Sequence, residues 1–420
     1  MPNRIVLYKT ILFGIRFTFL SIILPYRTLY VILNRILTFG ILIMKVDIFP
    51  LDIAKGPAFC NRDKERALLK HNIENNTHTI IYAPRRYGKT SLVLKACDES
   101  AKADNEIYFL DLDLMWVASI ENVIHIMLKE TSQLLARIIP AYEQALSLIK
   151  DIGKHVEASL SLSNNGFKLD LKAAKASPDS LIDILNMIDS FAVRKNKKIV
   201  IFLDEFQQIS ELEEKVSIEA AFRSAAQKSR NTTYIFSGSN RHMLSMMFED
   251  KSRPLYHICD QINLKRISNE SYLEHIGNAA KLHWKETIDE AAISTILLLT
   301  RRHPYYVNSL CRIVFQYKSP PTVDDIKKEW DKYVNREEKR FLAEFTQLSN
   351  VQRKLLQGLC LYPTNQPTSN EFLNLAKVKH GSVKKALDKL YALDMIHKSD
   401  RGGIIEPTDP VVLAGIQQTT

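Results

Sequence analysis

Residues 80–92 place a short apolar run, a tight loop and a helix start in immediate succession, and this feature limits the fold more than any other. The loop reads Ala83-Pro84-Arg85-Arg86-Tyr87-Gly88-Lys89-Thr90 and matches the phosphate-loop pattern G-x-x-x-x-G-K-[ST], except that Ala83 replaces the first glycine. A triphosphate at such a loop needs backbone N–H groups around its β- and γ-phosphates and the positive end of the following helix. The segment therefore predicts a nucleoside triphosphate site.

Three residues of this loop have defined tasks if a triphosphate binds. Gly88 lets the backbone approach closely, Lys89 supplies a positive charge, and the Thr90 hydroxyl can ligate Mg²⁺. A bare Gly-Lys-Thr triplet also occurs in ordinary basic turns, so the prediction needs a second element. The expected nucleotide-contacting set also includes the neighbouring residues Pro84, Arg85, Arg86, Tyr87 and Ser91.

That second element is the apolar run from Lys198 that ends in two acids, Asp204 and Glu205. Such a run is typical of a central parallel strand buried on both faces, and its carboxyl end faces the crevice where α/β sheets bind ligands. Asp204 would hold Mg²⁺, directly or through water, and Glu205 would act as the general base on the attacking water. The alternative is a solvated strand end.

With these motifs in place, the chain resembles the archaeal-type ATPases, a prokaryotic group of P-loop proteins related to the STAND and AAA+ classes. The resemblance covers most of the chain after residue 44. Phe59-Cys60-Asn61-Arg62-Asp63-Lys64-Glu65 is similar to the family's F-x-x-R-x-x-E box, and residues 83–90 are similar to its phosphate loop. Asp204-Glu205-Phe206-Gln207 resembles its Walker B segment, and residues 234–240 resemble the strand that follows. His303-Pro304-Tyr305-Tyr306 resembles its G-x-P segment.

The resemblance implies further roles. Ser239 or Asn240, at the end of the strand after the Walker B segment, would sense the γ-phosphate. His303 and Pro304 would contact nucleotide phosphate from a helical lid, and a winged helix would follow the lid.

The resemblance leaves the source of an arginine finger open. After Pro254-Leu255-Tyr256 the family often carries Gly-Arg, whereas this chain has His257-Ile258. Arg241 and Arg253 are candidate substitutes, each with a plain surface arginine as the alternative. A partner or a neighbouring subunit is the other source.

Composition limits the class of protein. With 420 residues, of which 46% are apolar, the chain can bury a sizeable core in two or three domains. The formal charge of +10 favours acidic partners such as nucleic acid or anionic lipid. The five cysteines form no C-x-x-C motif, so we expect reduced thiols in a cytoplasmic protein and neither a zinc site nor a disulfide framework.

Residues 1–43 are apolar and basic and contain no acid. The segment has three interpretations: a membrane anchor, a targeting peptide, or translated sequence that precedes a functional start at Met44. We favour the start at Met44, with a membrane-associated helix second. Membrane contact is expected only if this segment is retained.

Strand and helix patterns alternate between residues 79 and 239, which predicts an α/β fold with a parallel, doubly wound sheet. The strands are expected at Thr79–Tyr82, Ile107–Asp111, Lys198–Asp204 and up to Ser239, and the helices at residues 89–101, 121–150, 178–195 and 216–229. Alternating apolar residues around Asn165-Gly166 predict a hairpin, either a contact arm or a surface decoration. Residues 269–340 look helical throughout.

The last eighty residues or so predict three short helices and a two-stranded wing. Capping-box patterns begin at Ser349 and Thr368, a third helix starts near Ser382, and the strands lie near residues 395–398 and 404–405. The lysines around the third helix, which are Lys379, Lys384, Lys385 and Lys389, suit phosphate contacts in DNA. Winged helices also dock proteins, and both interpretations stay open.

We therefore expect four parts: the segment 1–43, a P-loop ATPase core at 44–266, a helical lid at 267–340 and a winged helix at 341–420. The expected function is a nucleotide-dependent molecular switch that binds ATP and Mg²⁺, hydrolyses ATP slowly or on activation by a partner, and relays its state to the winged helix. The alternatives are an ATP-regulated DNA-binding protein and a membrane-associated scaffold with little hydrolysis. A homo-oligomer is compatible with each.

Overall fold

The structure is a computed structural model, and it describes residues 47–139, 156–163, 166–399 and 402–419. The chain divides into a unit Met1–Asp47 and a unit Ile48–Thr420, and every element below belongs to the second. The segment predicted at residues 1–43 lies outside the described residues. Within the described ranges, no helix combines the length and the apolar character needed to cross a membrane.

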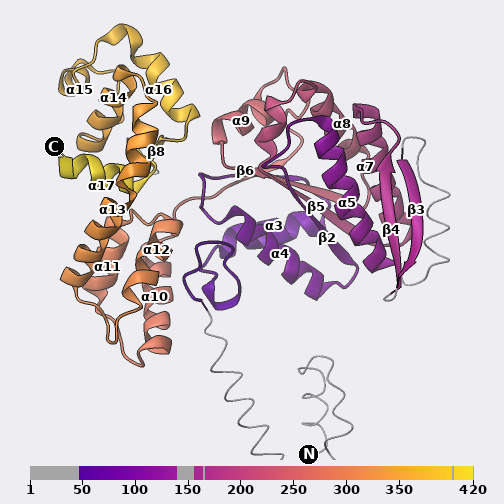
Figure 1. Ribbon diagram of the computed structural model, residues 1–420, viewed down its shortest axis with the longest axis horizontal. Helices are drawn as coiled ribbons and strands as arrows, with labels where there is room; N and C mark the ends of the chain where they lie inside the picture. Colours follow the sequence, from indigo (N-terminus) through magenta and orange to yellow (C-terminus); the bar gives the residue numbers. More distant parts are fainter. Residues whose placement is uncertain (1–46, 140–155, 164–165, 400–401, 420) are drawn as a thin grey trace, which may run out of the picture. The chain divides into compact units, whose positions relative to one another are not determined.

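A five-stranded parallel sheet forms the centre of the first half (Figure 1). Its strand order is β2-β5-β6-β1-β7, so the chain crosses over repeatedly, as the predicted doubly wound fold requires. The strands are β1 (Thr79–Tyr82), β2 (Ile107–Asp113), β5 (Lys198–Asp204), β6 (Thr232–Gly238) and β7 (Asp260–Asn263).

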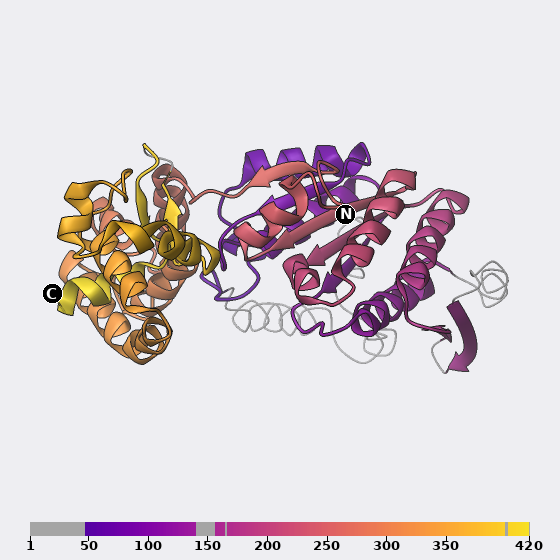
Figure 2. The same ribbon diagram turned by 90° about the horizontal axis from the view of Figure 1, so that it is seen from above.

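Helices cover both faces of this sheet (Figure 2). On β5, Val200 and Phe202 pack toward one face, together with α3 and α4. Ile201 and Leu203 pack toward the other, together with α5, α7, α8 and α9. This burial on both faces explains why β5 reads as a continuous apolar run. The helices are α3 (Asp63–Glu74), α4 (Lys89–Ala103), α5 (Ile120–Ile138), α7 (Pro178–Arg194), α8 (Lys215–Lys228) and α9 (Arg241–Glu249).

Helix starts follow local chemistry closely. Ser177 caps α7, because its side chain accepts a hydrogen bond from the Ser180 backbone N–H, and Pro178 occupies the first turn as predicted. Helix α3 begins at Asp63 and was not predicted as a helix. The predicted helix over residues 121–150 corresponds to α5, and its portion from residue 140 lies outside the described residues.

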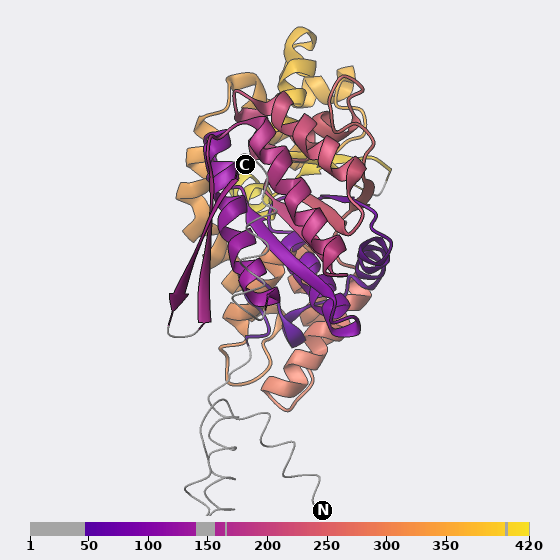
Figure 3. The same cartoon turned by 90° about the vertical axis from the view of Figure 1, so that its right-hand side faces the viewer.

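The predicted hairpin is confirmed. Strands β3 (Val156–Ser163) and β4 (Gly166–Ala173) pair antiparallel, with Ser163 opposite Gly166, and form a ribbon beside α5 (Figure 3). Leu169 and Leu171 are buried in the core that α5 also lines. This half of the ribbon is therefore anchored by apolar burial.

Residues 269–346 are helical, as predicted for the lid. The helices are α10 (Asn269–His283), α11 (Glu290–Leu299), α12 (Pro304–Val314) and α13 (Val323–Thr346). They bury one apolar cluster, to which Phe49 and Val411 from outside the lid also contribute. Helix α13 passes through the predicted boundary at residue 340 and contributes Phe341 to the next cluster, so the lid and the C-terminal part share a helix.

The C-terminal part contains the predicted three helices and two-stranded ribbon, in that order. Its elements are α14 (Asn350–Leu361), α15 (Asn370–Leu375), α16 (Val383–Ala392), β8 (Ile396–Lys398), β9 (Ile405–Pro407) and α17 (Pro410–Thr419). The capping box at Ser349 and Gln352 is confirmed. The second cap is Ser369 rather than Thr368, because the Ser369 side chain accepts from the Phe372 N–H.

Candidate active site

The loop between β1 and α4 has the backbone that the sequence predicts. Gly88 is the N-cap of α4 with φ of +84°, a left-handed conformation that favours glycine. A Cβ at Gly88 would meet nothing within 4 Å, so the conformation, not crowding, requires glycine there. Ala83 is fully buried and is absent from the positive-φ positions, which explains why alanine fits where the pattern has its first glycine.

Lys89 is buried beneath this loop, with 6% of its surface exposed. Its Nζ donates to the Pro84 carbonyl oxygen at 3.4 Å. Burial lowers the pKa of Lys89, and the nearby carboxylates of Glu205 and Asp204 oppose that shift. The structure thus brings the predicted lysine and the two predicted acids to the same edge of the sheet.

Asp204 lies at the end of β5 and accepts three hydrogen bonds. The Thr90 hydroxyl donates to its Oδ2 at 2.6 Å, while the Ser237 hydroxyl and the Glu205 N–H donate to its Oδ1 at 2.5 and 3.0 Å. Thr90 and Asp204, far apart in sequence, therefore place two hard oxygen ligands side by side, as a Mg²⁺ site would need. Ser237, at the end of the neighbouring strand β6, was not predicted.

Glu205 is half-buried and has a left-handed backbone, with φ of +54°. Its Oε2 accepts from Gln207 Nε2 at 2.5 Å, from the Ser239 hydroxyl at 2.7 Å and from the Ser239 N–H at 3.2 Å. Burial raises the pKa of Glu205, but these hydrogen bonds and the charge of Lys89 outweigh it and lower the pKa below its ordinary value. Glu205 is thus held as a carboxylate.

A cleft of about 330 Å³ opens over the loop. Of the predicted site residues, its walls include Arg85, Arg86, Tyr87, Gly88, Lys89, Thr90, Ser91, Glu205 and Pro304. Three more stretches line it, which are residues 50–54, Ala58 to Cys60, and the lid residues Tyr272, Tyr305 and Asn308. The cleft is therefore bounded by the phosphate loop on one side and by the lid and the stretch before α3 on the other.

The stretch at residues 50–54 is a part of the site that the sequence did not reveal. The Ser91 hydroxyl accepts from the Ala54 N–H at 3.0 Å, and Asn308 Nδ2 donates to the Pro50 carbonyl at 2.8 Å. These two bonds tie the stretch to α4 and to α12. It matches no motif, and only the long-range contacts reveal it.

His303 lies just below the cleft, as the N-cap of α12. It is 5% exposed, and its ring meets the Tyr87 ring edge-on at 4.8 Å between centroids. Burial, reinforced by the positive charges of Arg266 and Arg86, lowers the pKa of His303 to about 3. The imidazole is therefore neutral at physiological pH in the described fold.

The two predicted γ-phosphate sensors are engaged with protein groups. Ser239 donates to Glu205, as described above. Asn240 caps α9, and its Nδ2 donates to the carbonyl oxygen of Ala392 in the C-terminal part at 3.2 Å. The next residue, Arg241, pairs with Asp394 at 3.0 Å.

The arginine-finger candidates are also paired. Arg253 forms an ion pair with Glu219, which is fully buried on α8, and the pair is bidentate. Arg86, a phosphate-loop residue that was not a finger candidate, lies over the Tyr305 ring, with its guanidinium carbon 4.1 Å from the ring centroid. Arg253 therefore has a structural role in the described fold.

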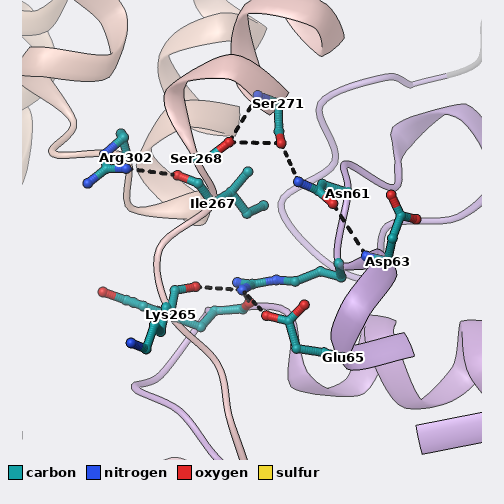
Figure 4. Close-up of polar contacts among 10 residues, drawn as sticks. Asn61, Asp63, Glu65, Lys265, Ile267, Ser268, Ser271 and Arg302 are labelled. Atoms are coloured by element: carbon teal, nitrogen blue, oxygen red, sulfur yellow. Dashed lines mark hydrogen bonds and ion pairs between the residues drawn. The ribbon is translucent and has the colours of Figure 1, made fainter. Parts of the chain in front are cut away.

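The junction between the core and the lid is held by the predicted box before α3 (Figure 4). Arg62 is 7% exposed and donates to the carbonyl oxygens of Lys265 at 2.5 Å and of Tyr87 at 3.3 Å, and it also pairs with Glu65. Asn61 donates to the hydroxyl of Ser271 on α10. The box thus connects the phosphate loop to the start of the lid.

Comparisons with known proteins agree with this architecture. A sequence model of the family described as an ATPase domain predominantly from Archaea matches residues 59–307. Among solved structures, the chain is similar to the Walker-type ATPase paby2304 of Pyrococcus abyssi, with a TM-score of 0.63 and 17% identity over 88% of this chain and 99% of that one.

The chain is also similar to the ORC2 protein of Aeropyrum pernix. The TM-score is 0.52 at 12% identity for the ADP form, which covers 89% of this chain and 97% of that one. For the ADPNP–ADP complexes the TM-score is 0.54 at 13% identity, and the match covers 90% of this chain and 98% of that one. No curated protein matches the chain. At these identities the likeness establishes the fold, a parallel α/β core followed by helical regions.

Proposed function

Because the chain belongs to the family of ATPase domains found predominantly in Archaea, we propose that it is an ATP-driven molecular switch. In this proposal the chain binds ATP with Mg²⁺, hydrolyses it slowly and passes its nucleotide state to a C-terminal winged helix. The observation that carries the proposal is the meeting of Lys89, Thr90, Asp204 and Glu205 at one edge of the sheet. The Aeropyrum pernix ORC2 structures of ADP and ADPNP–ADP complexes support an adenine nucleotide.

The loop residues would bind the triphosphate. The helix α4 begins at Gly88 without a side-chain cap, so its first backbone N–H groups are available to phosphate oxygens. Lys89 would add its positive charge from below, and Arg85 and Arg86, both exposed on the cleft wall, would add theirs from outside. His303 and Pro304 would approach from the lid.

The Thr90 hydroxyl and the Asp204 carboxylate fit a Mg²⁺ ion, because both are hard oxygen ligands and they lie within 2.6 Å of each other. When bound, the ion would neutralise charge on the phosphate oxygens. The Ser237 hydroxyl orients the Asp204 carboxylate through its bond to Oδ1. Glu205, ionised and fixed by its own donors, would accept a proton from the attacking water.

The contacts between the end of β6 and the C-terminal part suggest how nucleotide state could be relayed. Asn240 and Arg241 are bonded to Ala392 and Asp394, close to the site. In our proposal a γ-phosphate attracts Asn240 and Arg241 and thereby weakens both bonds. Turnover would be slow, because Arg253, a candidate arginine finger, is bound to Glu219, so a partner or neighbouring subunit would supply that charge.

The hydrolysis proposal is tested by measuring ATP binding and ATP turnover with the full chain, Lys89→Ala and Glu205→Gln. We expect turnover in the wild type, loss of binding and turnover in Lys89→Ala, and binding without turnover in Glu205→Gln. Removal of a general base costs on the order of 10²- to 10⁴-fold. Wild-type turnover that survives Glu205→Gln would contradict the assigned role.

The relay is tested by hydrogen–deuterium exchange of residues 390–398 with ADP and with a non-hydrolysable ATP analogue. We expect faster exchange with the analogue, and fast exchange with both nucleotides in Arg241→Ala. His242→Ala, an exposed neighbour on α9, is the matched control and should behave like the wild type. Equal exchange with the two nucleotides in the wild type would refute the relay.

An ATP-regulated DNA-binding protein is the second candidate, and a group of exposed lysines favours it. Lys384, Lys385 and Lys389 lie on the solvent side of α16, and Lys379 lies just before it. Replacing Lys384 and Lys385 by glutamine should make the log–log salt slope of DNA binding shallower, by about 0.9 for each DNA phosphate that is no longer neutralised. Lys228→Gln, an exposed lysine on α8, is the control. Undetectable DNA binding by the full chain at low salt would exclude this candidate.

A further inference from the structure

The side chain of Gln207 is buried directly after the two acids of β5. It lies on the short 3₁₀ helix η3 (Phe206–Glu211), which follows Glu205, and only 4% of its surface is exposed. Its Nε2 donates to Glu205 Oε2 at 2.5 Å. A buried glutamine whose amide meets a carboxylate forms a charge-assisted hydrogen bond, stronger than a bond between neutral groups.

The orientation of this amide is chemically determined. If the amide were reversed, its oxygen would face the carboxylate of Glu205, and two acceptors would meet without a proton. In the observed orientation, Gln207 Oε1 has no hydrogen-bond partner among the described residues. Burying an unpaired amide oxygen is unfavourable, so the position of Gln207 needs support from its other contacts.

Gly238, the last residue of β6, provides the space for that amide. A Cβ at this position would lie 1.8 Å from Gln207 Oε1 and 2.9 Å from its Cδ. The φ of Gly238 is not in the left-handed region, so no backbone strain requires glycine. Room for Gln207 is therefore the physical reason for glycine at the end of this strand.

The hydrogen bonds to Glu205 all reach the same oxygen. Gln207 and the two donors of Ser239 bind Oε2, which leaves Oε1 as the oxygen that can accept a proton from water. The positive charge of Lys89 also attracts this carboxylate. Without the amide of Gln207, only Ser239 would hold Oε2, and Glu205 could then turn toward Lys89 and lose the orientation that a general base requires.

We propose that Gln207 is a positioning residue that fixes the orientation of the Glu205 carboxylate for hydrolysis. Gly238, which has no side chain, leaves the space that the Gln207 amide occupies. The inference rests on the proposed function, since it needs Glu205 to be the general base. Misplacement of a reacting group by about 1 Å can cost on the order of 10²-fold in rate. Gln207 does not line the cleft, so nucleotide affinity should stay the same.

The test measures kcat and KM for ATP with the full chain, Gln207→Ala and Gln208→Ala. The second variant is the matched control, because the adjacent Gln208 lies on the same 3₁₀ helix but its amide meets Met115 Sδ at 4.0 Å. We expect kcat to fall roughly 10- to 100-fold in Gln207→Ala at a KM within about twofold of wild type. Gln208→Ala should keep both constants.

Three further variants make the result decisive. Gln207→Met keeps the length of the side chain and removes its donor, so it replaces Gln207→Ala if the latter does not fold. Gly238→Ala should displace the Gln207 amide and reproduce the loss of kcat. In a chain that already carries Glu205→Gln, Gln207→Met should lower kcat no further. Wild-type kcat in a folded Gln207 variant would overturn the inference. A wild type that binds ATP and never hydrolyses it would instead overturn the proposed function.

Discussion

Mild acid should destabilise this protein through His303, the buried N-cap of α12. The imidazole is enclosed by the rings of Tyr87 and Tyr306, with centroids at 4.8 and 5.0 Å. The charged or titratable groups that face it are Arg266, Arg86 and His397 of β8, and each of them disfavours a positive charge on the imidazole. Burial is the largest cause, and the pKa of His303 in the folded chain is about 3.

The direction and the size of this pH effect on stability follow from the difference between the pKa of His303 in the folded and in the unfolded chain. In the unfolded chain the ordinary histidine pKa is about 6.5, so below that pH the unfolded state takes up a proton that the folded state refuses. The contribution of His303 to stability is therefore intact above about pH 6.5 and is lost progressively as the pH falls toward about 3. At about pH 5 the loss amounts to roughly 2 kcal/mol.

The assay is urea unfolding at about pH 7.5 and about pH 5, for the wild type and His303→Gln. Between the two pH values, the free energy of unfolding should fall by about 2 kcal/mol more in the wild type than in the variant. The contributions of the other histidines are the same in both proteins and cancel in this difference. His242→Gln, which removes an exposed histidine of α9, should follow the wild type. Equal losses in the wild type and His303→Gln would refute the reasoning.

Three other changes test single contacts through the free energy of unfolding. Arg62→Ala removes the donor to Lys265 and Tyr87 and should cost about 3 kcal/mol, whereas Arg66→Ala, which breaks only surface ion pairs, should cost less than about 1 kcal/mol. Arg253→Ala leaves the buried Glu219 unpaired and should lower the free energy of unfolding by about 3–5 kcal/mol. Removing both partners with Arg253→Ala and Glu219→Met should destabilise the chain less, and greater destabilisation in this double variant would contradict the role of the pair. Ser349→Ala removes the capping box of α14 and should cost about 1 kcal/mol, and an unchanged denaturation midpoint would show that the cap contributes nothing.

The sequence was most informative where structure follows from local chemistry. The apolar run of β5, the helix starts at Ser177 and Ser349, and the hairpin around residues 164–165 depend on neighbours within a few positions. The carboxyl ends of parallel strands lie at one edge of the sheet. Lys89 follows the end of β1 and Asp204 ends β5, so their meeting could be expected from the sequence.

The sequence was least informative about partners that come from distant segments. The hydroxyl and the N–H of Ser239, an expected γ-phosphate sensor, both bind Glu205, and the sequence did not reveal this partner. Asn240 and Arg241 bind residues about 150 positions away, and no local pattern signals such a contact. The succession of β5 and β6 along the chain was a signal, because sequential strands usually lie side by side and polar residues at their ends are then expected to meet.

Boundaries between parts were also hard to predict. Helix α13 has a capped start at Thr322, and its amphipathic pattern continues through residue 340 to Thr346. Its apolar residues change partners along the helix, since Trp330 packs within the lid and Phe341 packs with the C-terminal part. Such a change of partner leaves no mark in composition.

The central claim is that this site hydrolyses ATP with Mg²⁺ through Glu205. The most direct measurement is a single-turnover assay in which γ-labelled ATP is bound to the full chain in EDTA and Mg²⁺ is then added in excess. We expect the wild type to release labelled phosphate after Mg²⁺ is added, while Glu205→Gln keeps the label as bound ATP. Release at equal rates from both proteins, or retention of intact ATP by the wild type, would contradict it.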